Sequence, residues 1–346
     1  MPRIAINGFG RIGRNTLKAG FDKLGFDVVA VNDLTDAKTL AHLLKHDSTY
    51  RTWEKNVTYN EKHLIVNGKK ILVLAEKDPI QLPWGKMKID VVLECTGRFT
   101  HLEGASQHIT AGATRVIISA PAKGGGVPTH VIGVNQKDAG KSKIINNASC
   151  TTNCIAPVAV ILHQAFGIKK AMMTTIHAYT AEQNLLDAAP PGLKSGDLRR
   201  ARAAAENIIP TTTGAAIATT EAIPELKGLF DGLAIRVPVP VGSLSDFTFV
   251  LQKKTSVEEI NATFKKAARH PVWKGIVEVT DEPIVSSDII GTTASAIVDL
   301  NLTKVVDGDL VKVIAWYDNE WAYSHRLAEM AILVGTKASQ TIDTRR

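Results

Sequence analysis

The apolar positions in the first 150 residues follow two different spacings. Short apolar runs predict strands at residues 3–6, 28–31, 89–93, 115–119, 131–135 and 144–145. Helical spacing predicts helices at residues 11–24, 37–44 and 102–111. In the first of these helices, Leu17, Phe21 and Leu24 share one face, and a turn at Asn67-Gly68 predicts a hairpin farther along the chain. Strands that alternate with amphipathic helices are typical of β–α–β units and of a parallel sheet.

The pattern changes after residue 150. Strands are predicted at residues 172–176, 233–238, 247–251, 276–279, 296–300 and 310–315. Helices are predicted at residues 155–166, 215–222, 257–268 and 322–334. Here several strands follow one another without an intervening helix, which indicates a second domain built on a largely antiparallel sheet.

Composition narrows the class of protein. The 346 residues are enough for two domains, and 45% apolar with 22% charged residues is typical of a soluble chain. No run approaches 18 apolar residues, the N-terminus shows no leader, and three cysteines make no disulfide framework, so we expect a cytoplasmic protein without membrane association. The net charge is +7, but the densest basic cluster, residues 199–202, is short, so nucleic-acid binding is not favoured.

A glycine motif follows the first predicted strand directly. Gly8, Gly10 and Gly13 form Gly-x-Gly-x-x-Gly, and Asp33 lies 20 positions beyond the last of them, after the second strand. The first glycine permits a tight turn, the second lets the backbone approach a pyrophosphate, and the third lets helix and strand pack closely. A carboxylate at position 33 can accept hydrogen bonds from ribose hydroxyls and would repel a 2′-phosphate. The motif therefore predicts a dinucleotide site with a preference for NAD over NADP.

Further cofactor contacts are expected where other strands end. Thr96, Gly97 and Ser119 follow predicted parallel strands, whose carboxyl ends face the cofactor crevice in such sheets. Cys95, beside them, is interpreted as a small buried apolar residue rather than as a reactive thiol.

The candidate nucleophile is Cys150, within Ala-Ser-Cys-Thr-Thr-Asn-Cys at residues 148–154. Ser149 is a good N-cap residue, so Cys150 would lie in the first helical turn, where the helix dipole favours a thiolate. His177 follows in a strand-like run and can supply a base. A half-buried structural cysteine is the alternative, but four small polar neighbours at this junction favour catalysis.

Two features suggest anion binding. Arg236 lies alone in an apolar strand and should have an anionic partner, either an internal carboxylate or a substrate phosphate. The Thr211–Gly214 run either donates to phosphate oxygens or starts the following helix, and the sequence supports both equally.

Six features spread over nearly the whole chain are shared with one known family. They are residues 6–14, 148–154, 211–216, 236–238 and 316–320, together with His177. In these features the chain resembles the phosphorylating (type I) glyceraldehyde-3-phosphate dehydrogenase family. The resemblance implies that Cys150 attacks the aldehyde of glyceraldehyde 3-phosphate, that His177 acts as its base, that NAD accepts the hydride, and that inorganic phosphate releases 1,3-bisphosphoglycerate.

The resemblance also assigns roles to further residues. It implies that one phosphate binds Thr180, Arg200 and Arg236, and that the other binds Ser149, Thr151, Thr213 and Gly214. It implies cofactor contacts at Arg11, Ile12, Asp33, Lys77, Ser119, Asn319 and Tyr323, beside the glycines. No metal site is implied. A homotetramer is implied, in which the loop after His177 reaches a neighbour's cofactor.

With this resemblance the fold class is α/β, with an N-terminal Rossmann-type dinucleotide-binding domain and an α+β catalytic domain whose sheet is mostly antiparallel. We expect residues 1–150 to form the NAD-binding domain, to which a C-terminal helix at 320–337 returns. Residues 151–319 form the catalytic domain, and 338–346 form a polar tail.

Some alternatives remain open at this point. Ala188-Ala189 stands where family members strict for NAD often have Leu-Pro, which leaves room for a 2′-phosphate, although Asp33 opposes it. Erythrose-4-phosphate dehydrogenase shares the fold, the cysteine and the histidine. A metal or redox module could be built from Cys150, Cys154, His163 and His177. The last alternative is not an enzyme. It is a protein that binds NAD and whose main role is to bind a partner.

Overall fold

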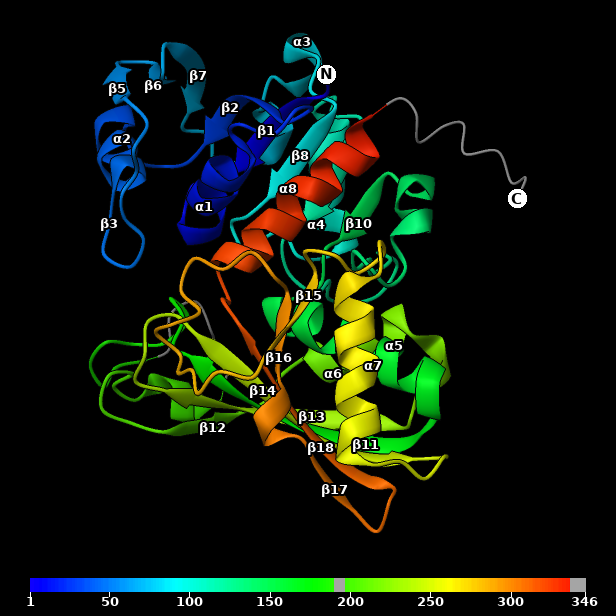
Figure 1. Cartoon of the computed structure of the whole chain (residues 1–346). Helices are drawn as coiled ribbons and strands as arrows, with labels where there is room; N and C mark the ends of the chain where they lie inside the picture. Colours follow the sequence, from blue (N-terminus) through cyan, green and yellow to red (C-terminus); the bar gives the residue numbers. More distant parts are fainter. Residues whose placement is uncertain (190–196, 337–346) are drawn as a thin grey trace. The chain divides into compact units, whose positions relative to one another are not determined.

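The computed structural model describes residues 1–189 and 197–336, and the predicted tail at 338–346 lies outside this part. The chain divides into two compact units (Figure 1). Unit 1 contains Met1–His130, Asn135–Ala148 and the chain from Ser324, and unit 2 contains Val131–Val134 and Ser149–Tyr323. The two units are described in turn.

Unit 1 is built on one sheet with the strand order β10-β9-β8-β1-β2-β7-β6-β5. Its strands are β1 (Arg3–Asn7), β2 (Asp27–Asn32), β5 (Val57–Asn60), β6 (His63–Val66), β7 (Lys69–Leu74), β8 (Val91–Glu94), β9 (Arg115–Ile118) and β10 (Ile144–Asn146). The six strands from β10 to β7 run parallel, whereas β6 and β5 are antiparallel additions. Because β2 and β8 flank β1 on opposite sides, the chain reverses direction across the sheet at β1, where such sheets bind ligands. The Rossmann-type prediction is confirmed.

The helices of unit 1 connect these strands. They are α1 (Arg11–Gly20), α2 (Ala37–Lys45), the single-turn α3 (Trp84–Met87), α4 (Leu102–Thr110) and the C-terminal α8 (Trp321–Gly335), with 3₁₀ turns η1 (Pro79–Gln81) and η2 (Gln136–Lys141). A two-residue pair, β3 (His46–Asp47) and β4 (Arg51–Thr52), forms a separate ribbon. At the end of α8, Gly335 lies so close to Pro2 and Val91 that a Cβ would be 2.7 Å from the Pro2 ring. The final helix therefore packs on the sheet of unit 1.

Two local predictions for the N-terminal half are wrong. The first helix ends at Gly20, where a Cβ would come within 2.2 Å of the Phe26 ring, and Leu24 lies beyond the helix with 89% of its surface exposed. The run at 131–135 is a turn, not a strand, because Gly133 adopts φ +86° and Val134 N–H donates to the Val131 carbonyl. The hairpin at Asn67-Gly68 is confirmed, with positive φ at both residues, as a two-residue hairpin turn requires.

Unit 2 is built on a second sheet with the order β12-β13-β11-β14-β18-β16-β15, and β17 pairs with β18. Its strands are β11 (Ile168–Ala178), β12 (Ile209–Thr211), β13 (Phe230–Val237), β14 (Ser243–Leu251), β15 (Val277–Thr280), β16 (Ala296–Asp299), β17 (Lys304–Val306) and β18 (Leu310–Tyr317). Only β11 with β13 and β15 with β16 run parallel, so the prediction of a mostly antiparallel sheet is confirmed.

Three helices and three 3₁₀ turns complete the described part of unit 2. They are α5 (Cys150–Phe166), α6 (Ala215–Ala222), α7 (Val257–Arg269), η3 (Leu198–Ala201), η4 (Pro224–Leu226) and η5 (Leu300–Leu302). Residues alternate between buried and half-buried along β14, from Ser243 to Leu251, because successive side chains point to opposite faces of the sheet. In the part of the chain that the structure describes, no helix is long and apolar enough to cross a membrane.

Candidate active site and dinucleotide pocket

The first turn of α5 presents Cys150, as the sequence predicted. Ser149 is the N-cap, and its Oγ accepts a hydrogen bond from Thr152 N–H at 3.0 Å. Asn153 Nδ2 donates to the Ser149 carbonyl at 2.9 Å and fixes the same turn from the other side. The residue before the cap, Ala148, has φ +55°, a strained conformation for a residue with a Cβ. Capping thus fixes the helix start, and the surrounding structure holds Ala148 in its strained conformation.

The structure brings the predicted base to the predicted nucleophile. His177 Nε2, from β11, lies 3.4 Å from Cys150 Sγ. On the other side of the ring, Nδ1 lies 2.6 Å from the Ala178 carbonyl oxygen and 2.9 Å from Arg236 Nη1. When Nδ1–H donates to the Ala178 carbonyl, the lone pair of Nε2 faces the thiol, which is the arrangement that a general base requires.

The buried Tyr317 contacts the two elements that carry Cys150 and His177. The Tyr317 hydroxyl lies 2.9 Å from Thr151 Oγ1 and 2.7 Å from Thr175 Oγ1, and its ring meets the edge of His177 with centroids 6.0 Å apart. Burial raises the pKa of Tyr317, so its hydroxyl stays protonated and serves as a hydrogen-bonding bridge. It ties the α5 turn to β11, because Thr151 and Thr175 belong to these two elements.

The surroundings affect the nucleophile and the base differently. Burial raises the pKa of the Cys150 thiol, while the charge of Arg236 and the N–H groups of Thr151 and Cys150 act in the opposite direction. Burial and then Arg236 lower the pKa of His177 to about 3. The helix start was expected to activate the thiol, but burial opposes ionisation there, so transfer of the proton to Nε2 is needed as well.

Two of the predicted phosphate residues, Arg200 and Arg236, share one carboxylate. Arg236 on β13 lies opposite His177 in the sheet register. Its Nη2 donates to Glu182 Oε1 at 3.0 Å, and Arg200 Nη1 reaches the same oxygen at 3.0 Å. Arg200 also donates from Nε to Thr211 Oγ1 at 2.8 Å. Of the two partners that the sequence left open for Arg236, the internal carboxylate is present.

The other predicted phosphate residues after β11 differ in their contacts. Thr213 Oγ1 accepts from Ala215 N–H at 3.1 Å, which is the helix-start interpretation of this run. Gly214 is the N-cap of α6, and a Cβ added there would meet no atom within 4 Å among the described residues. Thr180 Oγ1 is buried and finds no hydrogen-bond partner among them.

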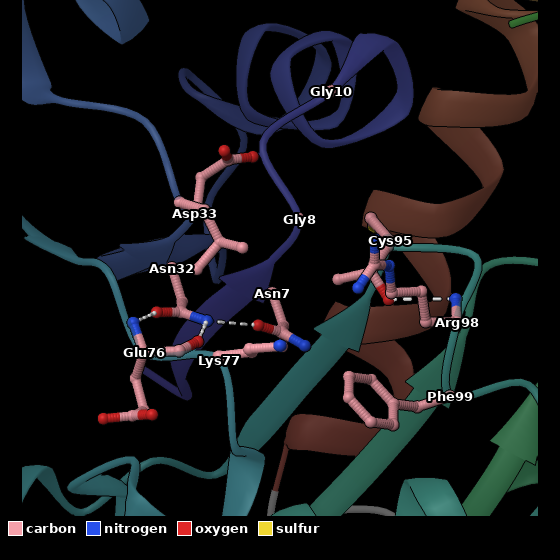
Figure 2. A pocket seen from close by; sticks show the side chains of 12 residues that line it. Asn7, Gly8, Gly10, Asn32, Asp33, Glu76, Lys77, Cys95, Arg98 and Phe99 are labelled. Atoms are coloured by element: carbon pink, nitrogen blue, oxygen red, sulfur yellow. Dashed lines mark hydrogen bonds between the residues drawn. The ribbon is translucent and has the colours of Figure 1, made fainter. Parts of the chain in front are cut away.

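A pocket in unit 1 surrounds the glycine turn (Figure 2). Its lining includes five residues that the sequence assigned to the cofactor, namely Gly8, Gly10, Asp33, Lys77 and Thr96. The Asp33 carboxylate is anchored to the turn, because Phe9 N–H donates to its Oδ2 at 2.8 Å. The pocket therefore joins a helix N-terminus to a fixed carboxylate, which suits a pyrophosphate and a ribose respectively.

The three glycines of the motif have different neighbours. A Cβ on Gly8 would lie 2.6 Å from Thr96 N, and a Cβ on Gly13 would lie 2.3 Å from the Gly8 carbonyl oxygen. A Cβ on Gly10 would meet nothing within 4 Å in the described part of the chain. Protein packing thus requires two of the glycines but not the third, whose open side faces the pocket. A bound pyrophosphate explains that third glycine, so these residues fit a dinucleotide.

Comparison with known proteins decides the family. The family model for the glyceraldehyde 3-phosphate dehydrogenase NAD binding domain matches residues 2–102, and the model for the C-terminal domain of the same enzyme matches residues 149–319. The chain is 52% identical over 337 residues to glyceraldehyde-3-phosphate dehydrogenase of Geobacillus stearothermophilus, covering 97% of this chain and 98% of that one. The chain belongs to the glyceraldehyde-3-phosphate dehydrogenase family.

Other members of this family are similarly close. Glyceraldehyde-3-phosphate dehydrogenase 1 of Bacillus cereus is 51% identical over 339 residues, covering 97% of this chain and 99% of the relative. The chloroplastic glyceraldehyde-3-phosphate dehydrogenase A of Chlamydomonas reinhardtii is 50% identical over 339 residues, covering 97% and 89%. Membership confirms the resemblance seen in the sequence, the assignment as an enzyme and the assignment of NAD as the cofactor.

Several residues that the sequence motifs or the family resemblance assigned to the cofactor lie outside the pocket lining. They are Arg11, Ile12, Gly13, Gly97 and Ser119 in unit 1, and Asn319 and Tyr323 in unit 2. The Arg11 guanidinium forms an ion pair with Asp47 at 2.5 Å. A cofactor contact at Arg11 would therefore come from its backbone N–H at the start of the helix. Asn319 is buried, and its Oδ1 accepts from Gly242 N–H and from Ser243 Oγ, which leaves its amino group as the end that can bind a carboxamide. Tyr323 is also buried.

Among the described residues, the side chains of the metal or redox alternative are not arranged as a metal site. His163 Nδ1 accepts from Ile168 N–H at 3.2 Å, and Cys154 Sγ lies 3.9 Å from the Ala315 carbonyl oxygen. Across residues 1–189 and 197–336, no group of three or more His, Cys, Asp or Glu side chains is placed to hold a metal ion. Burial raises the pKa of Cys95 to about 12, in keeping with its interpretation as an unreactive residue.

Sequence reasoning missed a buried polar network under the pocket. Glu94 Oε2 lies 3.0 Å from His108 Nε2 and accepts from Asn7 Nδ2 at 2.6 Å, and Asn32 Nδ2 donates to Asn7 Oδ1 at 2.7 Å (Figure 2 shows this last bond). Glu94 also accepts from Thr96 N–H at 2.8 Å. Because these bonds fix side chains that line the pocket, the network positions them. The available signal was a glutamate directly after an apolar strand, where a buried charge needs partners.

Proposed function

We propose that this chain catalyses the oxidative phosphorylation of D-glyceraldehyde 3-phosphate to 1,3-bisphosphoglycerate, the glycolytic reaction after which its relatives are named. The observation that carries the proposal is the contact of 3.4 Å between Cys150 Sγ and His177 Nε2, at the start of a helix and beside an arginine. A thiol paired with an imidazole is the arrangement that covalent aldehyde chemistry needs.

The steps follow from these groups. Cys150 passes its proton to His177 Nε2, and the thiolate adds to the aldehyde carbon, whose oxygen takes the proton to give a thiohemiacetal. His177 then removes the hydroxyl proton as the hydrogen on the same carbon leaves with both bonding electrons, as a hydride. NAD, when bound, is the acceptor of that hydride. The thioester on Cys150 is attacked by inorganic phosphate, which gives the acyl phosphate and restores the thiol.

Two anion sites are assigned to unit 2. We assign the substrate phosphate to Thr180, Arg200 and Arg236, because buried guanidinium groups require an anion and the Thr180 hydroxyl has no partner among the described residues. We assign inorganic phosphate to Ser149, Thr151, Thr213 and Gly214, beside the nucleophile. The Ser149 and Thr151 hydroxyls already bond Thr152 N–H and Tyr317, so Gly214 offers the more open surface.

The cofactor is assigned to the pocket of unit 1. The pyrophosphate belongs at the turn from Gly8 to Gly13, including the backbone of Arg11 and Ile12, and the adenosine ribose belongs at Asp33. Lys77, Thr96, Gly97 and Ser119 follow along the strand ends, and Asn319 and Tyr323 are assigned to the nicotinamide. On this basis residues 1–150 with the helix at 320–337 bind NAD, and residues 151–319 carry out catalysis.

We also propose a homotetramer in the cytoplasm. Unit 2 exposes a set of large apolar side chains, namely Leu185, Leu186, Leu198, Ile208 and Ile217, each at least 65% exposed. Assembly with further copies of the chain would remove such side chains from water. Light scattering coupled to gel filtration would measure the mass, and a monomer would contradict the assembly.

Steady-state kinetics test the function directly. The enzyme is assayed with glyceraldehyde 3-phosphate, inorganic phosphate and either NAD or NADP, and then with erythrose 4-phosphate in place of the first aldehyde. We expect phosphate-dependent reduction of NAD with glyceraldehyde 3-phosphate, and a lower kcat/KM with NADP. A higher kcat/KM with erythrose 4-phosphate would assign the chain to the other dehydrogenase.

A further inference from the structure

Two arginines from different elements share one carboxylate oxygen. Glu182 Oε1 lies 3.0 Å from Arg236 Nη2 and 3.0 Å from Arg200 Nη1. Arg236 belongs to β13, Arg200 to η3, and Glu182 to the turn that follows β11. These arginines are the groups to which the proposed function assigns the substrate phosphate. In this structure their anionic partner is supplied by the chain itself.

The three side chains differ in exposure. The side chains of Arg236 and Arg200 are 12% and 16% exposed, whereas that of Glu182 is 45% exposed. A buried guanidinium needs an anion close by, because it has lost much of its hydration. A carboxylate on the solvent side can return to water at small cost. Glu182 is therefore the member of the cluster that can leave.

The carboxylate does not satisfy the site fully. Arg236 Nε and Thr180 Oγ1 are buried polar atoms without a hydrogen-bond partner among the described residues. Both arginines use the same oxygen of Glu182. A phosphate group presents three terminal oxygens and up to two negative charges, so it can accept from more of these donors than one carboxylate oxygen does.

We propose that Glu182 is an internal substitute for the substrate phosphate, which holds Arg200 and Arg236 in position in the empty enzyme and withdraws when a phosphorylated aldehyde binds. This inference rests on the proposed function. Binding of the phosphate is then an exchange of one anion for another, so Glu182 lowers the affinity for every phosphorylated substrate. In return, the single negative charge of Glu182 offsets part of the positive charge of the two guanidinium groups and keeps them preorganised. Arg236 also contacts His177 Nδ1, so the exchange takes place beside the catalytic imidazole.

The test compares two aldehydes in one variant. Glu182→Gln keeps the shape of the side chain but removes its charge. We expect the KM for glyceraldehyde 3-phosphate to fall about two- to fivefold, the size of a partly exposed ion pair, and the KM for unphosphorylated glyceraldehyde to stay unchanged. The matched control is Asp187→Asn, which removes a carboxylate of the same loop that pairs with Arg202 at 2.8 Å. It should leave both values unchanged.

A second measurement does not depend on turnover. Inorganic sulfate raises the unfolding temperature if it binds the folded state. At one low sulfate concentration, the rise in unfolding temperature should be larger in Glu182→Gln than in the wild type or in Asp187→Asn. An equal or smaller rise, or a KM that is unchanged, raised or altered equally for both aldehydes, would overturn the role of Glu182. Failure of the wild type to oxidise glyceraldehyde 3-phosphate would instead overturn the proposed function, and the sulfate measurement would still decide the role of Glu182.

Discussion

The three glycines of the motif allow protein packing to be separated from cofactor binding. In Gly10→Ala the new methyl group meets no protein atom within 4 Å among the described residues, and φ at this position is −71°, which alanine adopts readily. In Gly13→Ala the methyl group would lie 2.3 Å from the Gly8 carbonyl oxygen and 3.1 Å from Ile6 Cγ2. The two substitutions add the same atom to one motif, but only the second one conflicts with the fold.

The expected magnitudes differ accordingly. For Gly10→Ala the free energy of unfolding should change by less than about 1 kcal/mol, the range of a glycine-to-alanine change without strain. NAD affinity should fall at least about tenfold, since about 1.4 kcal/mol is lost when a methyl group separates the backbone from the pyrophosphate. For Gly13→Ala the cofactor-free protein should lose about 1–3 kcal/mol, the usual cost of overpacking.

Two assays on each variant give the answer. Denaturant unfolding without cofactor measures stability, and titration with NAD measures affinity, with wild type and Gly13→Ala as references. If Gly10→Ala binds NAD as tightly as the wild type, the pyrophosphate does not lie at this turn. If it is destabilised as much as Gly13→Ala, the open space beside Gly10 does not exist in solution, and the reasoning is refuted.

The catalytic pair and the ribose carboxylate support three further predictions. Cys150→Ser should lower kcat by at least about 10⁴-fold, because the thiohemiacetal cannot form efficiently, and should leave NAD affinity within about twofold; turnover near the wild-type rate would remove Cys150 from the mechanism. Asp33→Ala should raise kcat/KM for NADP relative to NAD by about tenfold or more, because the like-charge repulsion of a 2′-phosphate is lost; an unchanged ratio would move the source of specificity elsewhere, with Ala188-Ala189 the next candidate. Alkylation of Cys150 by iodoacetamide reports the thiolate. Burial raises the pKa of this thiol, and His177 Nε2 is the base beside it, so His177→Asn should lower the alkylation rate at neutral pH by about tenfold or more. An unchanged rate would show that the imidazole takes no part in forming the thiolate.

The periodic elements could largely be predicted from the sequence because their causes are local. The cap at Ser149 and the turn at Asn67-Gly68 depend on neighbouring residues only, and both occur as expected. The prediction of a strand at 131–135 was wrong because a strand also needs a neighbouring strand to pair with, which an apolar run does not specify. The same limit applied at Leu24, where apolar spacing continued beyond the glycine that ends the helix.

The candidate site could be predicted only in part. Cys150 and His177 were identified by residue type and context, and the structure brings them together across 27 positions of the chain. The roles of Glu182 and Tyr317 were not foreseen, because each depends on partners that are brought close by folding. Glu182 meets Arg236 from 54 positions away, and Tyr317 meets Thr151 from 166 positions away.

The sequence by itself therefore determined the candidate residues for catalysis in this protein, where most of its helices begin, and that its glycine turn suits a dinucleotide. These properties follow from side-chain chemistry and from backbone preferences over a few residues. Only the tertiary structure decided which charges neutralise one another and whether the thiol is favoured as an anion. Burial and distance set those energies, and both come from strands and loops that the fold brings together from remote parts of the chain.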